Sequence, residues 1–131
     1  MGLLSLAKDV ADRVETEAVK AKTPVTVCVI DTHGNIVLQH RMEGAPIFSI
    51  EISERKAYTS ALVGVRTADL LALVQPGQAL YALSTVAGGR YCAMGGGVPL
   101  SEDGRVVAGV GVSGGTVEQD TAIVEAAAGK T

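Results

Sequence analysis

Aromatic side chains are scarce in this chain of 131 residues: tryptophan is absent, and phenylalanine and tyrosine together make up 3%. Proteins that bind single-stranded nucleic acid interleave aromatic rings with lysine and arginine. Here no basic stripe accompanies the four aromatic residues, and the formal net charge is −3. These residues are Phe48, Tyr58, Tyr81 and Tyr91. The sequence therefore argues against nucleic acid as a partner.

Cysteine and long apolar runs are also lacking. Cys28 and Cys92 alone make no disulfide framework, which is typical of a reducing compartment. No apolar run approaches the roughly 20 residues that span a bilayer. The cluster Leu3–Leu6 is followed at once by Lys8 and Asp9, unlike a signal peptide. We therefore expect a cytoplasmic protein with no membrane partner.

Small aliphatic residues are abundant instead. Apolar residues make up 47% of the chain, and its mean hydropathy is +0.32. At this length the chain forms one domain, residues 1–131, whose core is built from valine, alanine, leucine and isoleucine. Apolar surface left over from such a core favours burial between subunits, so we expect a homo-oligomer.

Hydrophobic periodicity and turn residues predict a small α/β domain of the α+β type. The order is helix, two strands, two helices, two strands and helix, which favours an antiparallel sheet with helices packed on it. Residues 80–94 give no decisive pattern, and we expect mixed loop and strand there. Ser49 is expected to cap the second helix, and Thr116 with Gln119 to form a capping box for the last. The predicted helices are 3–20, 49–63, a short one from 67 and one from 116 to 129; the predicted strands are 25–30, 36–42, 97–100 and 105–112.

Half of the 16 glycines lie between Gly95 and Gly115. Residues 109–114 match the dinucleotide pattern G-x-G-x-x-G, but no βαβ unit or acidic residue follows in the remaining chain. Residues 111–115 match the hydrolase pattern G-x-S-x-G, but no histidine follows Ser113. Two interpretations remain: backbone amides that face an anion, or glycines that permit close packing.

Polar residues elsewhere suggest further candidates. His33 lies in the first predicted hairpin turn, and His40 shares a strand face with Leu38 and Met42. Neither has the partners of a metal box, but either remains open as a lone ligand to haem iron, as do the tyrosines, Met94 and Cys92. Lys56 lies where it can point to a pocket, or it can belong to a solvated helix face together with Arg55, a neighbour that can pair with Glu51.

Several motifs together resemble the GlcG/HbpS family, which includes the C-terminal domain of PduO-type proteins. The resemblance covers nearly the whole chain and rests on residues 29–34 (VIDTHG), 41–46 (RMEGAP), 56–59 (KAYT), 96–99 (GGVP), 109–115 (GVGVSGG) and 118–120 (EQD). It implies a profilin-like fold with a five-stranded antiparallel sheet and an assembly of dimers or larger. It also implies haem binding in some members, iron binding or redox sensing with haem breakdown in others, and a genetic link to glycolate or diol utilisation. The histidine that ligates haem in the first helix of PduO-type domains has no counterpart in residues 3–20.

We expect a small-molecule-binding protein whose ligand is haem or another anionic metabolite, with no other cofactor. The predicted ligand-binding residues are Gly96, Gly97, Pro99, Gly111, Ser113 and Gly114, and the candidate metal ligands are His33 and His40. The first alternative is a cofactor-independent enzyme for a small hydroxy acid, aldehyde or diol. Its catalytic residues would be Lys56 as base or anchor, with Arg41, Glu43 and Asp31. The second is a non-catalytic oligomeric scaffold.

Overall fold

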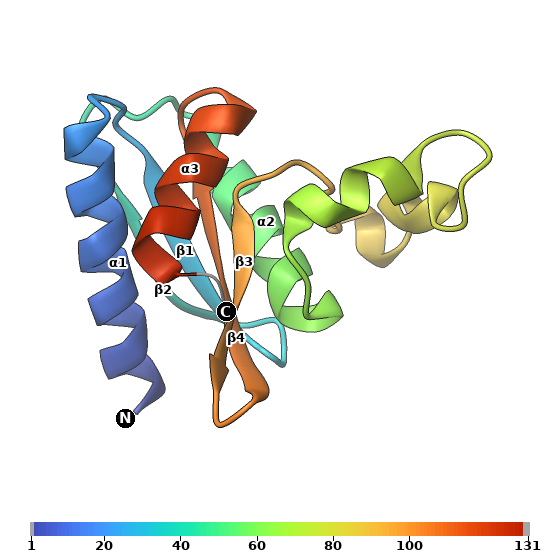
Figure 1. The fold of residues 1–131 in the computed structure, drawn as a ribbon, viewed down its shortest axis with the longest axis horizontal. Helices are drawn as coiled ribbons and strands as arrows, with labels where there is room; N and C mark the ends of the chain where they lie inside the picture. Colours follow the sequence, from blue (N-terminus) through green and yellow to red (C-terminus); the bar gives the residue numbers. More distant parts are fainter. Residues whose placement is uncertain (1, 130–131) are drawn as a thin grey trace.

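The computed structural model describes residues 2–129. Figure 1 shows the helices and strands in chain order. The helices are α1 (Leu3–Lys20), α2 (Ser49–Val63) and α3 (Val117–Ala128); the strands are β1 (Thr26–Asp31), β2 (Ile36–Arg41), β3 (Gly97–Glu102) and β4 (Arg105–Ser113); and three 3-10 helices, η1 (Thr67–Val74), η2 (Tyr81–Thr85) and η3 (Ala87–Gly89), lie between α2 and β3.

The sheet of the described residues has four strands in the order β2-β1-β4-β3, and every neighbouring pair is antiparallel. The α+β class and the flanking helices are therefore confirmed, but the expectation of five strands is wrong for residues 2–129. The mixed loop and strand expected at 80–94 is 3-10 helix and turn instead. Gly77, Gly88 and Gly89 all adopt positive φ, a conformation that interrupts an extended strand.

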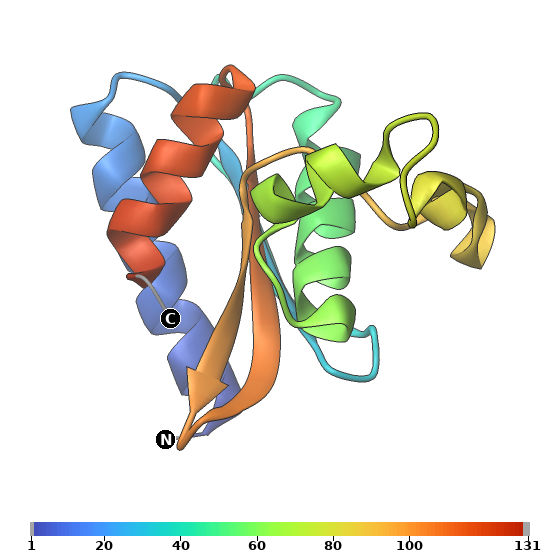
Figure 2. The ribbon, with the colours of Figure 1, turned by 45° about the vertical axis from the view of Figure 1, so that its right-hand side comes forward.

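Helices cover both faces of the sheet (Figures 1 and 2). The amphipathic helix α1 packs beside α3 on one face, where the main core is formed by alanine and valine side chains such as Val10, Val27 and Val110. Helix α2 covers the other face, where Cys28, Ile30 and Ala57 belong to a smaller cluster. The fold therefore has three layers, and mainly small aliphatic side chains fill the space between them.

Glycines allow α2 to approach β4 closely. A Cβ added at Gly111 would lie 2.5 Å from the backbone nitrogen of Ala57, and one added at Gly109 would lie 2.5 Å from that of Ala61. The facing side of α2 carries small residues, among them Ser53 and Ala57, both fully buried. Helix and strand therefore meet almost backbone to backbone, which a larger side chain on either partner would prevent.

The turn and cap predictions are largely confirmed. Gly34 takes positive φ in the β1–β2 hairpin, and the capping box between Thr116 and Gln119 starts α3. The expectation that Ser49 caps α2 is wrong, because Phe48 holds that position. The hydroxyl of Ser49 is instead used in packing: it lies 2.7 Å from that of Thr26 on β1.

No single helix among residues 2–129 is long and apolar enough to cross a membrane. Helix α2 and η1 together reach the required length and composition, but they are bent by 86°. Since α2 packs on the sheet, its apolar content is explained by the core.

Replacing Gly111 by alanine should destabilise the fold by about 1–3 kcal/mol, because the new methyl group would overlap the backbone of α2. Urea unfolding followed by circular dichroism measures this change. Gly2→Ser is a suitable control, since a Cβ at Gly2 has no neighbour within 4 Å. Equal stability of the Gly111→Ala variant and the wild type would contradict the close approach of α2 to β4.

Candidate functional site

The glycine-rich segments come together at one end of the sheet. Gly97 of β3 pairs with Gly111 of β4, and the amide of Val112 donates to the carbonyl of Gly96 at 2.8 Å. Ser113 also lies at this end, opposite Thr26 of β1. Gly114 follows Ser113 and lies against Pro24 and Val25. Five of the six predicted ligand-binding residues thus lie at this end of the sheet, and the sixth, Pro99, pairs with Gly109 further along β4.

Lys56 is buried among these glycines. Its side chain is 1% exposed, and its ammonium group donates to the carbonyl of Val112 at 2.9 Å and to the carboxylate of Asp120 at 3.2 Å. A Cβ added at Gly111 would lie 2.9 Å from Cβ of Lys56, and one added at Gly96 would lie 2.7 Å from its Nζ. The missing side chains therefore make room for the whole length of the lysine.

The Lys56–Asp120 ion pair joins two helices on opposite faces of the sheet. Lys56 belongs to α2 and Asp120 to α3, so the lysine reaches past the beginning of β3, where Gly96 leaves space. The other oxygen of Asp120 accepts the amide of Gly115 at 2.9 Å. Both oxygens of this buried carboxylate are thus satisfied, as burial of a charge requires.

Side chains of α3 also satisfy amides at its own beginning. Gln119 accepts from the amide of Thr116 at 2.8 Å, and Thr116 accepts from the amide of Gln119 at 3.1 Å. With Gly115 bonded to Asp120, three amides that could have faced an anion already have partners. The structure therefore favours the packing interpretation of the glycine-rich stretch at these positions, and ligand binding there stays a prediction.

The remaining predicted catalytic residues are divided between the two ends of the sheet. Arg41 and Glu43 are exposed, and Arg41 lies opposite Thr26 at the same end of the sheet as Ser113. Asp31 lies at the other end of β1, where its carboxylate accepts the amides of His33 and Asn35 at 2.9 and 3.0 Å. Five residues of extended strand separate Asp31 from the Arg41 end, roughly 17 Å, so these residues do not converge on one substrate within a single copy.

The two histidines differ in their surroundings. His33 is exposed in the β1–β2 turn, and no side-chain partner is found for it among the described residues. The Nδ1 of His40 lies 2.9 Å from a carboxylate oxygen of Glu15 on α1. Half of the His40 side chain and about a third of the Glu15 side chain are exposed, at 50% and 29%. No group of three potential metal-binding side chains is found among residues 2–129, so both histidines lack the further protein ligands of a metal box.

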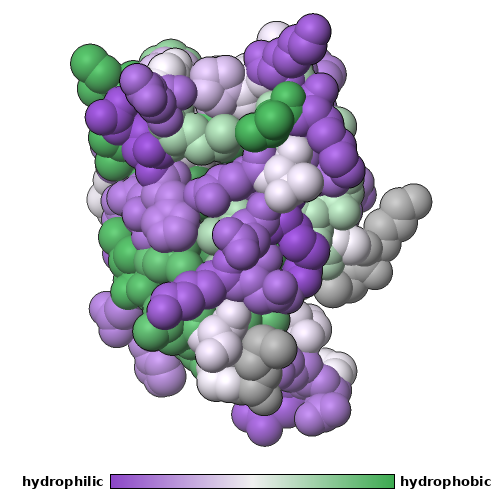
Figure 3. Space-filling view, turned by 90° about the vertical axis from the view of Figure 1, so that its left-hand side faces the viewer, coloured by the Kyte–Doolittle hydropathy of each residue, from purple (hydrophilic) through white to green (hydrophobic). Residues whose placement is uncertain are grey.

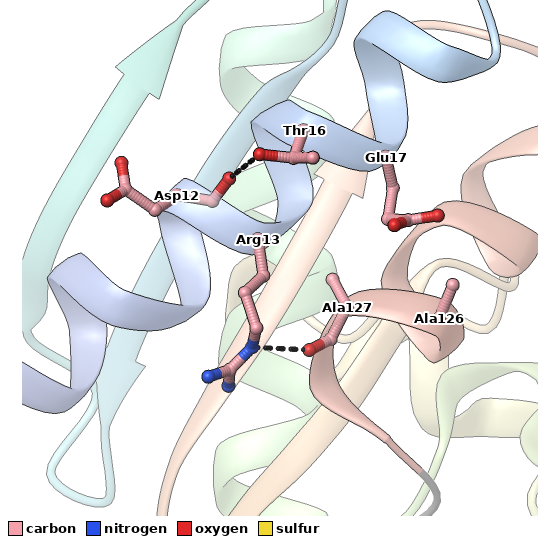
Figure 4. Close-up of a pocket in the computed structure, with 6 residues that line it drawn as sticks. All are labelled: Asp12, Arg13, Thr16, Glu17, Ala126 and Ala127. Carbon is pink, nitrogen blue, oxygen red and sulfur yellow. Dashed lines mark hydrogen bonds between the residues drawn. The ribbon is translucent and has the colours of Figure 1, made fainter.

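A groove runs between α1 and α3 (Figure 4). Across it, the guanidinium Nε of Arg13 donates to the carbonyl of Ala127 at 2.7 Å. Its two adjoining hollows measure about 170 and 360 Å³, below and at the lower end of the usual range for small-molecule pockets. They are lined by Asp12, Arg13, Thr16, Glu17, Lys20, Ala21, Ala122, Ile123, Ala126 and Ala127. None of these side chains is a usual ligand of haem iron, and the surrounding face is mainly hydrophilic (Figure 3).

A cluster on the α2 face was not predicted. The guanidinium of Arg90 lies 3.9 Å from the ring centre of Tyr58, whose ring centre is 5.4 Å from that of Tyr91. Burial and the neighbouring Tyr58 raise the pKa of Tyr91. Burial, and secondarily the charge of Glu54, raises the pKa of Cys28 to about 12, so this thiol is not a nucleophile at neutral pH.

Glu15 and Asp120 are the partners that the sequence analysis missed. Asp120 belongs to the EQD motif, but no local pattern connects it to a lysine 64 residues earlier. Glu15 lies on the polar side of an amphipathic helix, where a solvated carboxylate is the ordinary expectation. Both pairs depend on which helix covers which face of the sheet, so the three-dimensional arrangement is needed to find them.

Replacing Lys56 by methionine should lower the free energy of unfolding by about 3–5 kcal/mol, because Asp120 would remain buried without its counterion. Adding Asp120→Asn should restore much of this stability, since the asparagine oxygen can still accept the amide of Gly115. Urea unfolding measures both variants. Lys20→Met is the control, because the exposed Lys20–Glu17 pair is worth less than about 1 kcal/mol. A loss no larger than that of the control would contradict the structural role of Lys56.

A family model described as haem degrading protein HbpS-like matches residues 4–129 of the chain. The uncharacterized 15.0 kDa protein in the dhaT-dhaS intergenic region of Citrobacter freundii is 42% identical over 124 residues, covering 95% of this chain and 87% of that protein. The corrinoid adenosyltransferase PduO of Salmonella typhimurium is 39% identical over 110 residues. That match covers 84% of this chain but 33% of PduO, so the chain spans about a third of that protein.

The solved structures include a close match in fold. The crystal structure of a PduOC–haem complex superposes with a TM-score of 0.90 at 35% identity, covering 97% of this chain and 91% of that one. The match to the family model, together with the similarity to PduO and to GlcG of Escherichia coli, confirms the resemblance inferred from the sequence motifs. The chain belongs to the HbpS-like family.

Proposed function

We propose that this protein binds haem reversibly at an open site on β2, where His40 would ligate the iron. One observation carries the proposal: the carboxylate of Glu15 lies 2.9 Å from Nδ1 of His40. A carboxylate at one ring nitrogen orients an imidazole and leaves the other nitrogen available to a metal. Membership of a family described as haem degrading, and the haem complex of the related PduOC, support haem as the ligand.

The residues around His40 fit the chemical requirements of haem. When Nδ1 donates its hydrogen to Glu15, Nε2 carries the lone pair that iron needs. Leu38 and Met42 are partly buried against the core cluster on the same side of the sheet and provide apolar surface. Arg41 is exposed, and no ion pair is found for it among the described residues, but the alternation of side chains along β2 directs it to the face of the sheet opposite His40.

The exposure of the site favours reversible binding. Bound haem supplies an iron centre that binds small ligands and changes oxidation state. The chain itself would contribute the imidazole of His40, held in orientation by Glu15. Half of the His40 side chain faces solvent, so a ligand held there would remain partly open to solvent. Enclosed pockets bury about 70–90% of a ligand, so a one-sided site releases it more easily, as a carrier or reserve of haem requires.

Neither alternative gains support from a specific contact. Catalysis by Lys56 as base or anchor requires that its amine reach a substrate, but this amine is buried and bonded to Asp120 and Val112. A scaffold has no need for a histidine oriented by a carboxylate. The His40–Glu15 pair therefore favours a binding protein over both.

Hemin titration followed by Soret absorbance tests the proposal. The wild type should bind hemin with a shifted Soret band at micromolar concentration. His40→Ala should weaken binding more than tenfold, and Glu15→Ala by about 10–100-fold, because the ring loses its orienting partner. His33→Ala is the matched control, since His33 is an exposed histidine on the same hairpin, and its affinity should remain that of the wild type.

Two outcomes would overturn the assignment. Equal affinities of the wild type and His40→Ala would show that the imidazole does not ligate the iron. A loss of binding in His33→Ala with retention in His40→Ala would move the site to the hairpin turn. Circular dichroism of each variant checks that the fold is intact.

A further inference from the structure

The side of α1 that borders β2 carries a stripe of residues along its length. Seven residues complete two turns of an α-helix to within about 20°, so Lys8 and Glu15 point in nearly the same direction from the helix axis. Leu4 and Val19 extend the stripe by one turn at each end. Because Glu15 contacts His40 of β2, this α1 stripe (Leu4, Lys8, Glu15 and Val19) lies along the proposed haem site.

Helix α1 and strand β2 run in the same direction (Figure 1). The chain reverses between α1 and β1, and it reverses again in the antiparallel β1–β2 hairpin. Leu38 and Met42 flank His40 on the same face, and both are partly buried against the main core. Leu38 therefore lies toward the Lys8 end of the α1 stripe. Met42 lies toward the Val19 end.

The cations of α1 differ in their partners. The guanidinium of Arg13 pairs with Asp9, and the ammonium of Lys20 pairs with Glu17. Lys8 is exposed, and no ion pair is found for its ammonium within residues 2–129. Its charge is therefore available to an anion that approaches the α1 stripe.

The surfaces on the two sides of Glu15 differ in chemistry. Lys8 lies roughly 10 Å from Glu15 along the helix axis, at about 1.5 Å per residue. In the opposite direction, Val19 lies one turn from Glu15 and is 66% exposed. A ligand at His40 therefore meets a cation on one side and exposed aliphatic surface on the other.

We infer that Lys8 sets the orientation of a porphyrin at the His40 site by pairing with its propionates. The inference rests on the proposed function. Haem carries both propionates at one edge and hydrocarbon groups at the opposite edge. A lysine attracts the carboxylate edge, and contact with the hydrocarbon edge removes exposed aliphatic surface from water. The site therefore selects a porphyrin with free carboxylates, and Lys8 is a specificity-determining residue.

Other charged groups near β2 are less suited to this role. Arg41 is directed to the opposite face of the sheet. Lys22 follows the end of α1 and has a φ of 53°, so helical spacing does not place it on the α1 stripe. Asp12 lies one turn after Lys8, but no ion pair joins the two among the described residues. Lys8 is therefore the cation that the helical spacing places beside His40.

Titration of hemin and of hemin dimethyl ester tests the inference, because esterification removes the propionate charges and leaves the macrocycle and iron unchanged. Lys8→Met should weaken hemin binding about threefold, the effect of one exposed ion pair. Lys8→Glu should weaken it further through repulsion, and both losses should diminish at high ionic strength. The affinity for the dimethyl ester should stay that of the wild type in both variants. Lys22→Met, at another exposed lysine, is the matched control and should bind both ligands like the wild type.

Nuclear magnetic resonance of the ferric complex gives a second measurement. The ring methyl groups of haem report its orientation, so one orientation should dominate in the wild type, and Lys8→Met should show a second orientation at comparable population. Urea unfolding should give the two proteins equal stability, since the Lys8 side chain is exposed.

The outcomes separate this inference from the function on which it rests. A wild type without hemin affinity, or with an affinity equal to that of His40→Ala, overturns the proposed function and the inference together. Hemin binding that depends on His40 but is unchanged in both Lys8 variants overturns the inference alone. Equal losses of hemin and dimethyl ester affinity in Lys8→Met also overturn it, because the lysine would then act without a carboxylate. A loss confined to Lys22→Met places the propionates at the other end of the α1 stripe and overturns it as well.

Discussion

The buried ion pair between Lys56 and Asp120 connects α2 and α3, two helices that otherwise make little contact with each other. It links α2 on one face of the sheet to α3 on the other, and it occupies the place where β3 begins. Two buried charges of this kind contribute little net stability compared with an apolar pair, but removing one partner is costly. The pair therefore acts mainly as a constraint on geometry: α3 must begin where Asp120 can meet both the lysine and the amide of Gly115.

That constraint accounts for much of the glycine-rich sequence. Gly96 and Gly111 make room for the lysine side chain, and Gly109 with Gly111 lets α2 approach the sheet so closely that the lysine can reach past β3. In the sequence, the same glycines match a nucleotide loop and a hydrolase turn. Short patterns of glycine report only where a side chain is absent; whether the space is filled by a ligand or by a neighbouring helix depends on the tertiary packing.

Local features were predictable because their causes are local. The periodicity of residues 3–20, the two hairpin turns and the capping box of Thr116 and Gln119 depend on neighbours within a few positions. The His40–Glu15 contact and the Lys56–Asp120 pair join residues 25 and 64 positions apart, and the β1–β4 pairing joins residues further apart still. One sequence does not encode such distances in any pattern of spacing. Ser49 shows how tertiary contacts override a local preference: the residue type suits a helix cap, but its hydroxyl is used against Thr26 in the core.

The segment between α2 and β3 shows a similar limit on what apolar residues in a sequence can predict. Its leucines are as hydrophobic as those of the core, yet Leu70 is 3% exposed and its neighbour Leu71 is 53% exposed. Sequence alone indicates that such residues avoid water, but not whether the cover comes from the same chain or another.

The contact between His40 of β2 and Glu15 of α1 also bears on how this chain differs from its relatives. The family resemblance implies a haem-ligating histidine in the first helix of PduO-type domains, whereas α1 of this chain supplies the carboxylate of Glu15, and β2 supplies the imidazole. Under the proposed function, the same two elements would hold the ligand with their roles exchanged. His40 lies on an exposed edge strand, and Glu15 is in position to orient its ring. The absence of a histidine from residues 3–20 is therefore compatible with haem binding at this edge of the sheet.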